Sequence, residues 1–87
     1  MIKLSLYIEL INTPNPNAKK IELVHDLTVG TVINSSDNTS NELCSKILDI
    51  SGIISIFVGP GFLTVTKDEE RSWDLINTDI ITQFDTL

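Results

Sequence analysis

Few residues of this sequence are of the types that bind metals or act as nucleophiles: one cysteine, Cys44, and one histidine, His25. A metal ion or an iron–sulfur cluster needs several cysteine, histidine or carboxylate ligands that converge at set spacings. Because His25 and Cys44 stand far apart in the chain, the sequence predicts no metal site and no cofactor. Asp26 could orient the imidazole of His25, but a solvent-exposed histidine at a strand end is the favoured interpretation.

Cys44 itself has two interpretations. Its place on the apolar side of an expected helix favours a small, buried and unreactive thiol. The alternative is that two chains each contribute Cys44 to a bridged cluster, although cluster sites normally use four thiolates. A single cysteine cannot form an internal disulfide, so the chain is expected in a reducing compartment, the cytoplasm.

Carboxylates are frequent, but their arrangement does not predict catalysis. Four of them cluster where a helix is expected to start, Asp68, Glu69, Glu70 and Asp74, and there they stabilise the positive end of the helix dipole. Nothing places two carboxylates across a cleft with separated pKa values. No serine lies in a nucleophile elbow, and Pro60 lacks the backbone donor that a phosphate-binding loop would use. The sequence therefore predicts no catalytic residue and no enzyme.

The charge balance argues against two classes of partner, nucleic acids and membranes. The chain carries 12 acidic and 6 basic side chains, for a net charge of −6. Nucleic acids and anionic membranes are bound by clustered basic residues, whereas here only Lys19 and Lys20 are adjacent. That pair is expected to be a solvated strand end, with a docking point for an acidic partner as the alternative. No apolar run approaches the roughly 20 residues of a membrane span, and the first residues lack the pattern of a leader peptide.

The strands that would position these side chains follow from alternation of apolar residues. The expected strands cover residues 2–10, 19–24, 53–58 and 62–67, with a shorter one at 31–33. Segment 13–17, Thr-Pro-Asn-Pro-Asn, is predicted to be a stiff exposed loop, because each proline fixes its own backbone and extends the residue before it. Gly59, Pro60 and Gly61 predict the turn of a β-hairpin.

Two helices are expected as well. Polar residues 34–41 predict a loop, and Thr39 with Glu42 has the spacing of a capping box for the first helix, which Gly52 would end. The apolar face of this helix is expected to contain Leu43, Cys44, Ile47 and Leu48. The second helix would begin with acids 68–70 in its first turn, and its apolar stripe is Trp73, Ile76, Ile80, Phe84 and Leu87.

Together these elements predict an α+β two-layer sandwich. A mostly antiparallel sheet of about four to five strands would carry two helices packed on one face, since this arrangement buries each apolar face. With 87 residues the chain has length for one core, so residues 1–87 are expected to form a single domain.

Several segments resemble the N-terminal domain of the Nfu/NifU-like iron–sulfur cluster scaffold family. The most specific segment is Thr13-Pro14-Asn15-Pro16 followed by Lys20-Ile21. Three further segments match in order and spacing, Leu48 to Gly59, Phe62 to Lys67, and Trp73. The chain departs from the family at Thr78, where a proline is common, and at Leu23-Val24-His25, where Leu-Pro-Gly often stands.

The resemblance implies an accessory protein-interaction domain in iron–sulfur cluster assembly or delivery. In the family a second domain with a Cys-x-x-Cys motif binds the cluster, and this sequence contains no such motif. The implied partners are iron–sulfur carrier or client proteins, or a Cys-x-x-Cys cluster domain; the alternative is a free-standing adaptor with unrelated protein partners. There are two candidate contact surfaces, and an exposed sheet edge is a further option. One is the stiff loop with Thr13, Pro14, Asn15 and Pro16, which would lose little entropy on docking, and the other is the hairpin tip, Gly59, Pro60 and Gly61, which exposes its proline between two glycines.

Overall fold

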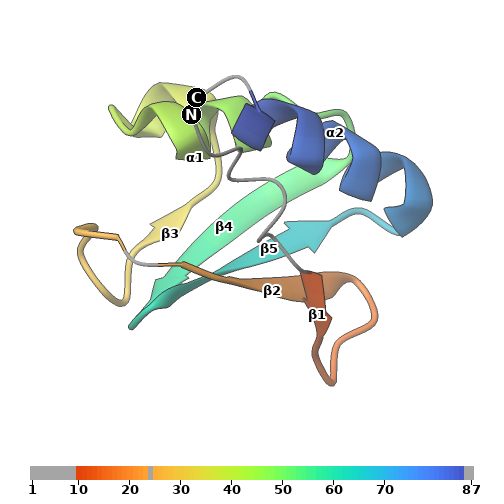
Figure 1. Cartoon of the computed structure of the whole chain (residues 1–87), viewed down its shortest axis with the longest axis horizontal. Helices are drawn as coiled ribbons and strands as arrows, with labels where there is room; N and C mark the ends of the chain where they lie inside the picture. Colours follow the sequence, from red (N-terminus) through yellow and green to blue (C-terminus); the bar gives the residue numbers. More distant parts are fainter. Residues whose placement is uncertain (1–9, 24, 86–87) are drawn as a thin grey trace.

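In the part of the chain that the structure describes, five antiparallel strands form one sheet in the order β1-β2-β5-β4-β3, and two helices lie across one face of it (Figure 1). The computed structural model describes residues 10–23 and 25–85 of the chain. The strands are β1 (Leu10–Asn12), β2 (Ala18–Glu22), β3 (Val32–Ile33), β4 (Ile53–Gly59) and β5 (Phe62–Lys67). The two helices on the sheet are α1 (Glu42–Leu48) and α2 (Trp73–Asp85), and a short 3-10 helix, η2 (Ser36–Asn38), precedes α1. The predicted α+β two-layer sandwich is confirmed, while residues 2–9 of the first predicted strand lie outside the described residues.

The predicted hairpin forms the centre of this sheet. Gly59 pairs with Phe62, so that Pro60 and Gly61 make a two-residue turn. Gly61 has a φ of 72°, and a positive φ directly after a proline is typical of a type II turn. A Cβ on Gly59 would overlap the ring of Phe62, so the ring packs directly against the glycine backbone. Glycine is therefore needed at both positions, at one for its φ and at the other for space.

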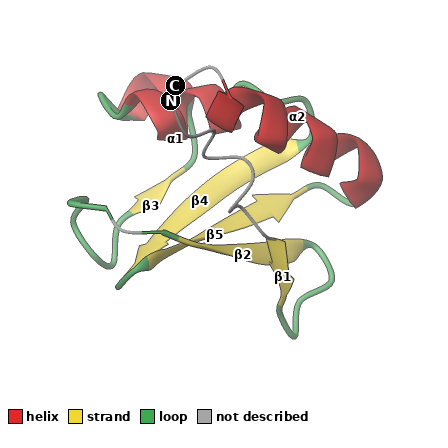
Figure 2. Ribbon diagram, in the orientation of Figure 1, coloured by secondary structure: helices red, strands yellow, loops and turns green. Residues whose placement is uncertain are grey.

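The helices lie over one face of the sheet (Figure 2), and alternate residues of the central strands form an aliphatic core with residues of the helices. The fully buried side chains are Ile21, Ile56, Val58, Leu63 and Val65 from the sheet and Cys44, Ile47, Ile76 and Ile80 from the helices. Burying one aliphatic side chain of this size contributes roughly 1.5–3 kcal/mol. The predicted apolar faces of both helices are confirmed at these positions, whereas the side chain of Phe84 and residue Leu87 lie outside the described part of the chain.

The start of α1 differs from the prediction. Asn41, and not Thr39, caps the helix, because Asn41 Oδ1 accepts a 2.9 Å hydrogen bond from the N–H of Cys44. Thr39 Oγ1 instead accepts from the N–H of Asn41 at 3.0 Å, which forms a small turn before the helix. Asparagine is a stronger N-cap than threonine, so the cap forms two residues later than the capping-box spacing suggests. The predicted loop 34–41 also contains η2.

The start of α2 also differs from the prediction, because acids 68–70 precede the helix. Asp68 Oδ1 accepts from the N–H groups of Glu70 and Arg71, at 3.0 and 3.1 Å, and so builds a separate turn. The hydroxyl of Ser72 accepts from the N–H of Asp74 at 3.1 Å, and helix α2 follows. A short carboxylate side chain that bonds to nearby backbone competes with the helix, which explains why the helix starts after these acids.

Gly52 has a different role from the predicted helix stop. Helix α1 already ends at Leu48, with Asp49 as its C-cap. Gly52, at φ 95°, belongs to the next turn, which is closed by a 3.1 Å hydrogen bond from the N–H of Ile53 to the carbonyl of Ile50. The glycine therefore directs the chain into β4 rather than ending α1.

Candidate functional site

Segment 13–17 is held in one conformation by hydrogen bonds of its own side chains. Thr13 Oγ1 accepts from the N–H of Asn15 at 3.2 Å and lies 2.9 Å from the carbonyl of Ala18, to which it can donate. The Asn15 carbonyl accepts from the N–H of Ala18 at 3.0 Å, and Asn15 Oδ1 accepts from the N–H of Asn17 at 2.9 Å. Turns of this kind, added to two prolines, confirm the predicted stiff loop.

Trp73, the first residue of α2, attaches this loop to the helix layer. The indole Nε1–H donates a 2.8 Å hydrogen bond to the carbonyl of Pro16. On the other side of the loop, the backbone N–H of Lys67 donates to the carbonyl of Asn17 at 2.8 Å. The loop after β1 is therefore fixed both to the end of β5 and to the beginning of α2.

Two lysines lie against the same indole ring. The Nζ of Lys19 is 5.2 Å from the centroid of the Trp73 ring, and the Nζ of Lys67 is 5.8 Å from it, within the range of a cation–π interaction. The side chain of Lys67 is only 7% exposed, and its Nζ donates to Asn17 Oδ1 at 3.1 Å and to the Asp68 carbonyl at 2.9 Å. The ammonium of Lys67 is thus hydrogen-bonded to neutral oxygens.

A surface hollow of about 390 Å³ opens between this loop and the indole. It is lined by residues 12–16, Ala18, Lys19 and Trp73. The walls combine two proline rings and an indole with the hydroxyl and amide groups of the loop and one ammonium. The candidate contact residues Thr13, Pro14, Asn15 and Pro16 are thus brought together with two residues from β2 and with Trp73.

Reasoning from the sequence placed Trp73 in the core and missed its bond to the loop, as well as the role of Lys67. A signal for Lys67 was present in β5. The buried side of this strand contains Leu63, Val65 and Lys67. The alternation of the sequence therefore places a charged residue on the side that faces the core. A charged side chain in that position needs hydrogen-bonding partners, and here the loop supplies them.

The second predicted segment, Gly59, Pro60 and Gly61, lies at the other end of the β2–β5 ladder (Figure 1). Ala18 pairs with Thr66 near loop 13–17, whereas Glu22 pairs with Phe62 beside the hairpin tip. The structure therefore does not join the two segments into one site. The carbonyl of Gly61 accepts from the N–H of Leu23 at 3.2 Å, so that part of the tip is already bonded within the chain.

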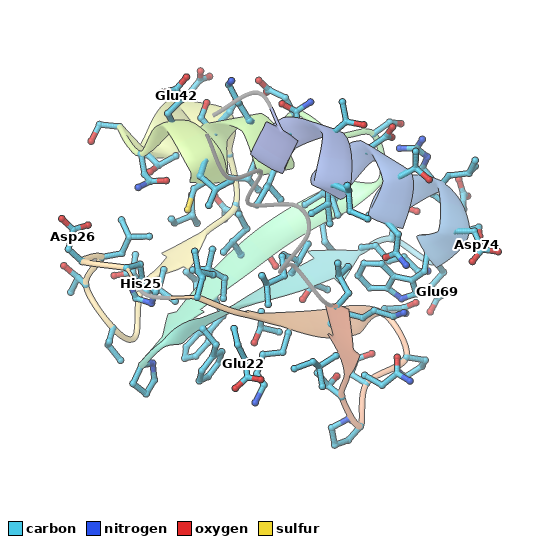
Figure 3. All side chains as sticks on the ribbon, viewed as in Figure 1. Glu22, His25, Asp26, Glu42, Glu69 and Asp74 are labelled. Carbon is cyan, nitrogen blue, oxygen red and sulfur yellow. The ribbon has the colours of Figure 1, made fainter. Side chains whose placement is uncertain are left out.

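His25 holds the hairpin tip from the side, and it is half-buried rather than solvent-exposed as expected. Its Nε2 lies 2.7 Å from the carbonyl of Gly59, and its Nδ1 accepts from the N–H of Leu27 at 3.1 Å. Asp26 lies apart from the imidazole at the outer surface, so it does not orient the ring (Figure 3). Because both ring nitrogens bond to backbone, the role of His25 in this fold is structural.

Cys44 is fully buried in the core, as the favoured interpretation predicts. Burial raises the pKa of the thiol, because the thiolate would lose its hydration. A thiol in this position cannot reach a cluster shared with a second chain while the fold is intact, which argues against the alternative interpretation.

The remaining features of the described residues offer less to a ligand. A hollow of about 360 Å³ lies between the end of α1 and α2, but its Arg71 is engaged by Asp79 at 2.9 Å and by the carbonyl of Ser51. Within residues 10–23 and 25–85 no three histidine, cysteine or carboxylate side chains gather in a way that could hold a metal ion. None of the helices described in this part of the chain is both long and apolar enough to cross a membrane.

Curated relatives of the sequence include a protein named as an iron-sulfur cluster scaffold homolog and a protein named as NifU-like. The human protein NFU1 iron-sulfur cluster scaffold homolog, mitochondrial, is 33% identical over 79 residues, and NifU-like protein 5, mitochondrial, of Arabidopsis thaliana is 30% identical over 79 residues. These alignments cover 86% and 87% of this chain but only 31% and 29% of the relatives. The chain thus spans less than a third of the length of these relatives.

Solved structures share the fold of this chain, and a family model matches most of its sequence. The crystal structure of protein SAV1430 from Staphylococcus aureus has a TM-score of 0.76 at 26% identity, covering 88% of this chain and 96% of that one. The solution structure of a NifU-like protein from Saccharomyces cerevisiae has a TM-score of 0.73 at 29% identity, covering 91% of this chain and 75% of that one. The family described as scaffold protein Nfu/NifU N terminal matches residues 8–87. The chain therefore belongs to the Nfu/NifU scaffold protein N-terminal family.

Proposed function

We propose that this chain is an accessory protein-binding domain in iron–sulfur cluster assembly or delivery. Membership of the Nfu/NifU family supports a role in this process. The name of the human relative, which describes it as an iron-sulfur cluster scaffold homolog, supports the same role. In this proposal the chain neither catalyses a reaction nor holds the cluster. Its partners are iron–sulfur carrier or client proteins, or a Cys-x-x-Cys cluster domain. A reducing compartment such as the cytoplasm is part of the proposal, because a buried thiol and cluster chemistry both suit it.

The observation that carries the proposal is the bond from the Trp73 indole to the carbonyl of Pro16. It gives a partner a loop whose shape is set before contact, next to a half-exposed tryptophan. Ordering a flexible side chain at an interface costs about 0.5–1.5 kcal/mol, so a loop that is already ordered favours binding. Tryptophan is also among the residues that most often dominate binding energy at protein interfaces.

The hairpin tip is the second candidate surface, and less supports it. Two of its carbonyls, those of Gly59 and Gly61, already have partners within the chain. Pro60 is the exposed residue that remains for contact. We therefore assign partner binding to loop 13–17 with Trp73. The hairpin tip provides the control position for the binding experiment.

The test is an amide-shift titration of the isotope-labelled chain with a cluster-loaded Cys-x-x-Cys carrier domain. We expect shifts at residues 13–19 and at the indole N–H of Trp73. The variant Pro14→Ala should weaken binding, whereas Pro60→Ala, which also replaces an exposed proline but at the opposite end of the sheet, should not. The reverse order would assign binding to the hairpin tip. No shifts at a large excess of carrier would reject the iron–sulfur role and favour an adaptor with unrelated partners.

A further inference from the structure

Apart from Lys20, whose amine lies over Phe62, the described basic residues fall into two groups that differ in their partners. Lys46 and Arg71 each have a carboxylate within 4.0 Å, at 3.4 Å from Glu42 and 2.9 Å from Asp79. Among the residues that the structure describes, the amines of Lys19 and Lys67 have no carboxylate at that distance, although the chain has twice as many acidic as basic side chains. These two amines converge on one indole ring, which they approach to 5.2 and 5.8 Å.

This convergence is costly for the isolated domain. Lys67 is 7% exposed, so its ammonium has lost most of its hydration, and neutral oxygens replace it only in part. The second ammonium, on the half-buried Lys19, adds repulsion around the same ring. A negative charge placed in the hollow would reduce both costs. Lys19 lines the hollow and would make the contact, while the charge of Lys67, 5.8 Å from the centroid of the same ring, would act from outside the lining.

We propose that the hollow beside Trp73 binds a short segment of a partner protein that carries one carboxylate between apolar side chains. The carboxylate would accept a hydrogen bond from the ammonium of Lys19, and the apolar side chains would pack on the indole and on the rings of Pro14 and Pro16. The identity of the partner rests on the proposed function, but the chemistry of the segment rests on the geometry of the hollow alone.

The surroundings of the hollow explain why one carboxylate fits better than an acidic run. Helix α2 begins with Trp73, and acidic side chains lie around this start (Figure 3). Asp68 and Glu69 precede the helix, and Asp74 is in its first turn. Asp68 is occupied with backbone N–H groups, while Glu69 and Asp74 are exposed. A segment with several adjacent carboxylates would be repelled by these side chains, whereas a single carboxylate at Lys19 would not need to approach them.

The probe for this proposal is the blocked pentapeptide acetyl-Ala-Leu-Glu-Leu-Ala-amide, compared with its twin in which glutamine replaces glutamate. In a titration of the labelled chain we expect the glutamate peptide to shift the Trp73 indole N–H and the amides of residues 13–19. Since the sequence has one tryptophan, that indole signal is unambiguous. We expect the glutamine twin to bind about three- to tenfold more weakly, the range that corresponds to the usual net contribution of one hydrogen bond at a solvated surface.

Two matched variants complete the experiment. Lys19→Gln should reduce the affinity for the glutamate peptide by about three- to tenfold and abolish its advantage over the glutamine twin. Lys20→Gln removes the same charge from the next residue, whose amine lies over Phe62 on the opposite face of the sheet, and should leave binding unchanged. A well-dispersed amide spectrum for each variant checks that it folds.

Three results would overturn the proposal: no shift of the indole signal at about 5 mM peptide, equal binding of both peptides, or equal weakening by the two lysine variants. The experiment separates this inference from the proposed function. Peptide binding without carrier binding would reject the iron–sulfur role alone, and carrier binding without peptide discrimination would reject the carboxylate contact alone.

Discussion

The indole Nε1–H of Trp73 donates a 2.8 Å hydrogen bond to the carbonyl of Pro16, and so connects two positions 57 residues apart in the sequence. The other described hydrogen bonds of the loop are internal or join it to Ala18 and Lys67. Among the residues that the structure describes, the Trp73 bond is therefore the one that links the loop to the helix layer. It follows that the packing of α2 on the sheet adds to what the internal hydrogen bonds contribute to the shape of loop 13–17.

The variant Trp73→Phe tests this contribution of α2. Phenylalanine keeps an aromatic ring against the core and the two lysines but cannot donate to the carbonyl of Pro16. We expect the free energy of unfolding to fall by about 1 kcal/mol, the usual net value of one such hydrogen bond. Urea unfolding followed by circular dichroism gives the stability, since the variant lacks the tryptophan signal. Amide hydrogen exchange at Asn17 and Ala18 should become faster.

The control is Phe57→Leu, which changes an aromatic residue that is 40% exposed on the open face of the sheet. Exchange at Asn17 and Ala18 should not respond to it. If Trp73→Phe leaves loop exchange as slow as in the parent protein, then the loop is rigid without the helix and the contribution of α2 described above is wrong.

His25 and Asp26 provide a second test, because they are adjacent but have different surroundings. His25→Ala removes the contact with the Gly59 carbonyl and the acceptor for the N–H of Leu27, so we expect a loss of about 1–2 kcal/mol. Asp26→Ala changes an exposed side chain and should alter stability by about 0.5 kcal/mol or less. Urea unfolding of both variants makes the comparison. Similar losses in both would indicate that the carboxylate orients the imidazole after all.

Much of the fold was predictable because local periodicity and burial agree. Ile56, Val58, Leu63 and Val65 alternate along their strands and are all fully buried, as an alternating pattern predicts. The helix starts were less predictable, since several side chains compete for the same backbone N–H groups. At α2 the carboxylate of Asp68 takes two such groups in a separate turn, and the helix begins only after Ser72.

The candidate site was predictable in part. The stiffness of segment 13–17 follows from its two prolines and its asparagine side chains, which act over two or three residues. The bond from Trp73 to Pro16 could not be read in the same way. It depends on the register in which Ala18 pairs with Thr66, because that register brings the loop to the end of β5 and the start of α2. Register is a long-range property that no short window of sequence contains.

The start of α1 gives a third prediction. Asn41→Ala removes the side chain that accepts from the N–H of Cys44, and we expect it to lower the free energy of unfolding by about 1 kcal/mol, as for other N-cap asparagines. Thr39→Ala should cost about half of that or less, because its hydroxyl supports only the turn before the helix. Thermal or urea unfolding of the two variants decides between the caps. A larger loss of stability for Thr39→Ala would indicate that Thr39, and not Asn41, is the N-cap of α1.

The pH dependence of stability gives a fourth prediction, through Cys44. Burial raises the pKa of this thiol in the folded protein, whereas in the unfolded chain the thiol titrates at its ordinary pKa of about 8.5. Below that pH both states hold the proton, and the contribution of the buried thiol is complete. As the pH rises past about 8.5 the unfolded state loses its proton first, so the free energy of unfolding falls.

The matched variant is Cys44→Ala, which leaves a small cavity but has no thiol to titrate. The variant should be less stable than the parent at about pH 7, because it loses the packing of the buried sulfur. The difference between the two proteins should then narrow between about pH 8 and about pH 10, since only the parent loses stability through the thiol. Urea unfolding at several pH values measures this difference, which other titrating groups affect equally. Parallel curves over the whole range would show that the thiol ionises as readily in the folded protein as in the unfolded chain.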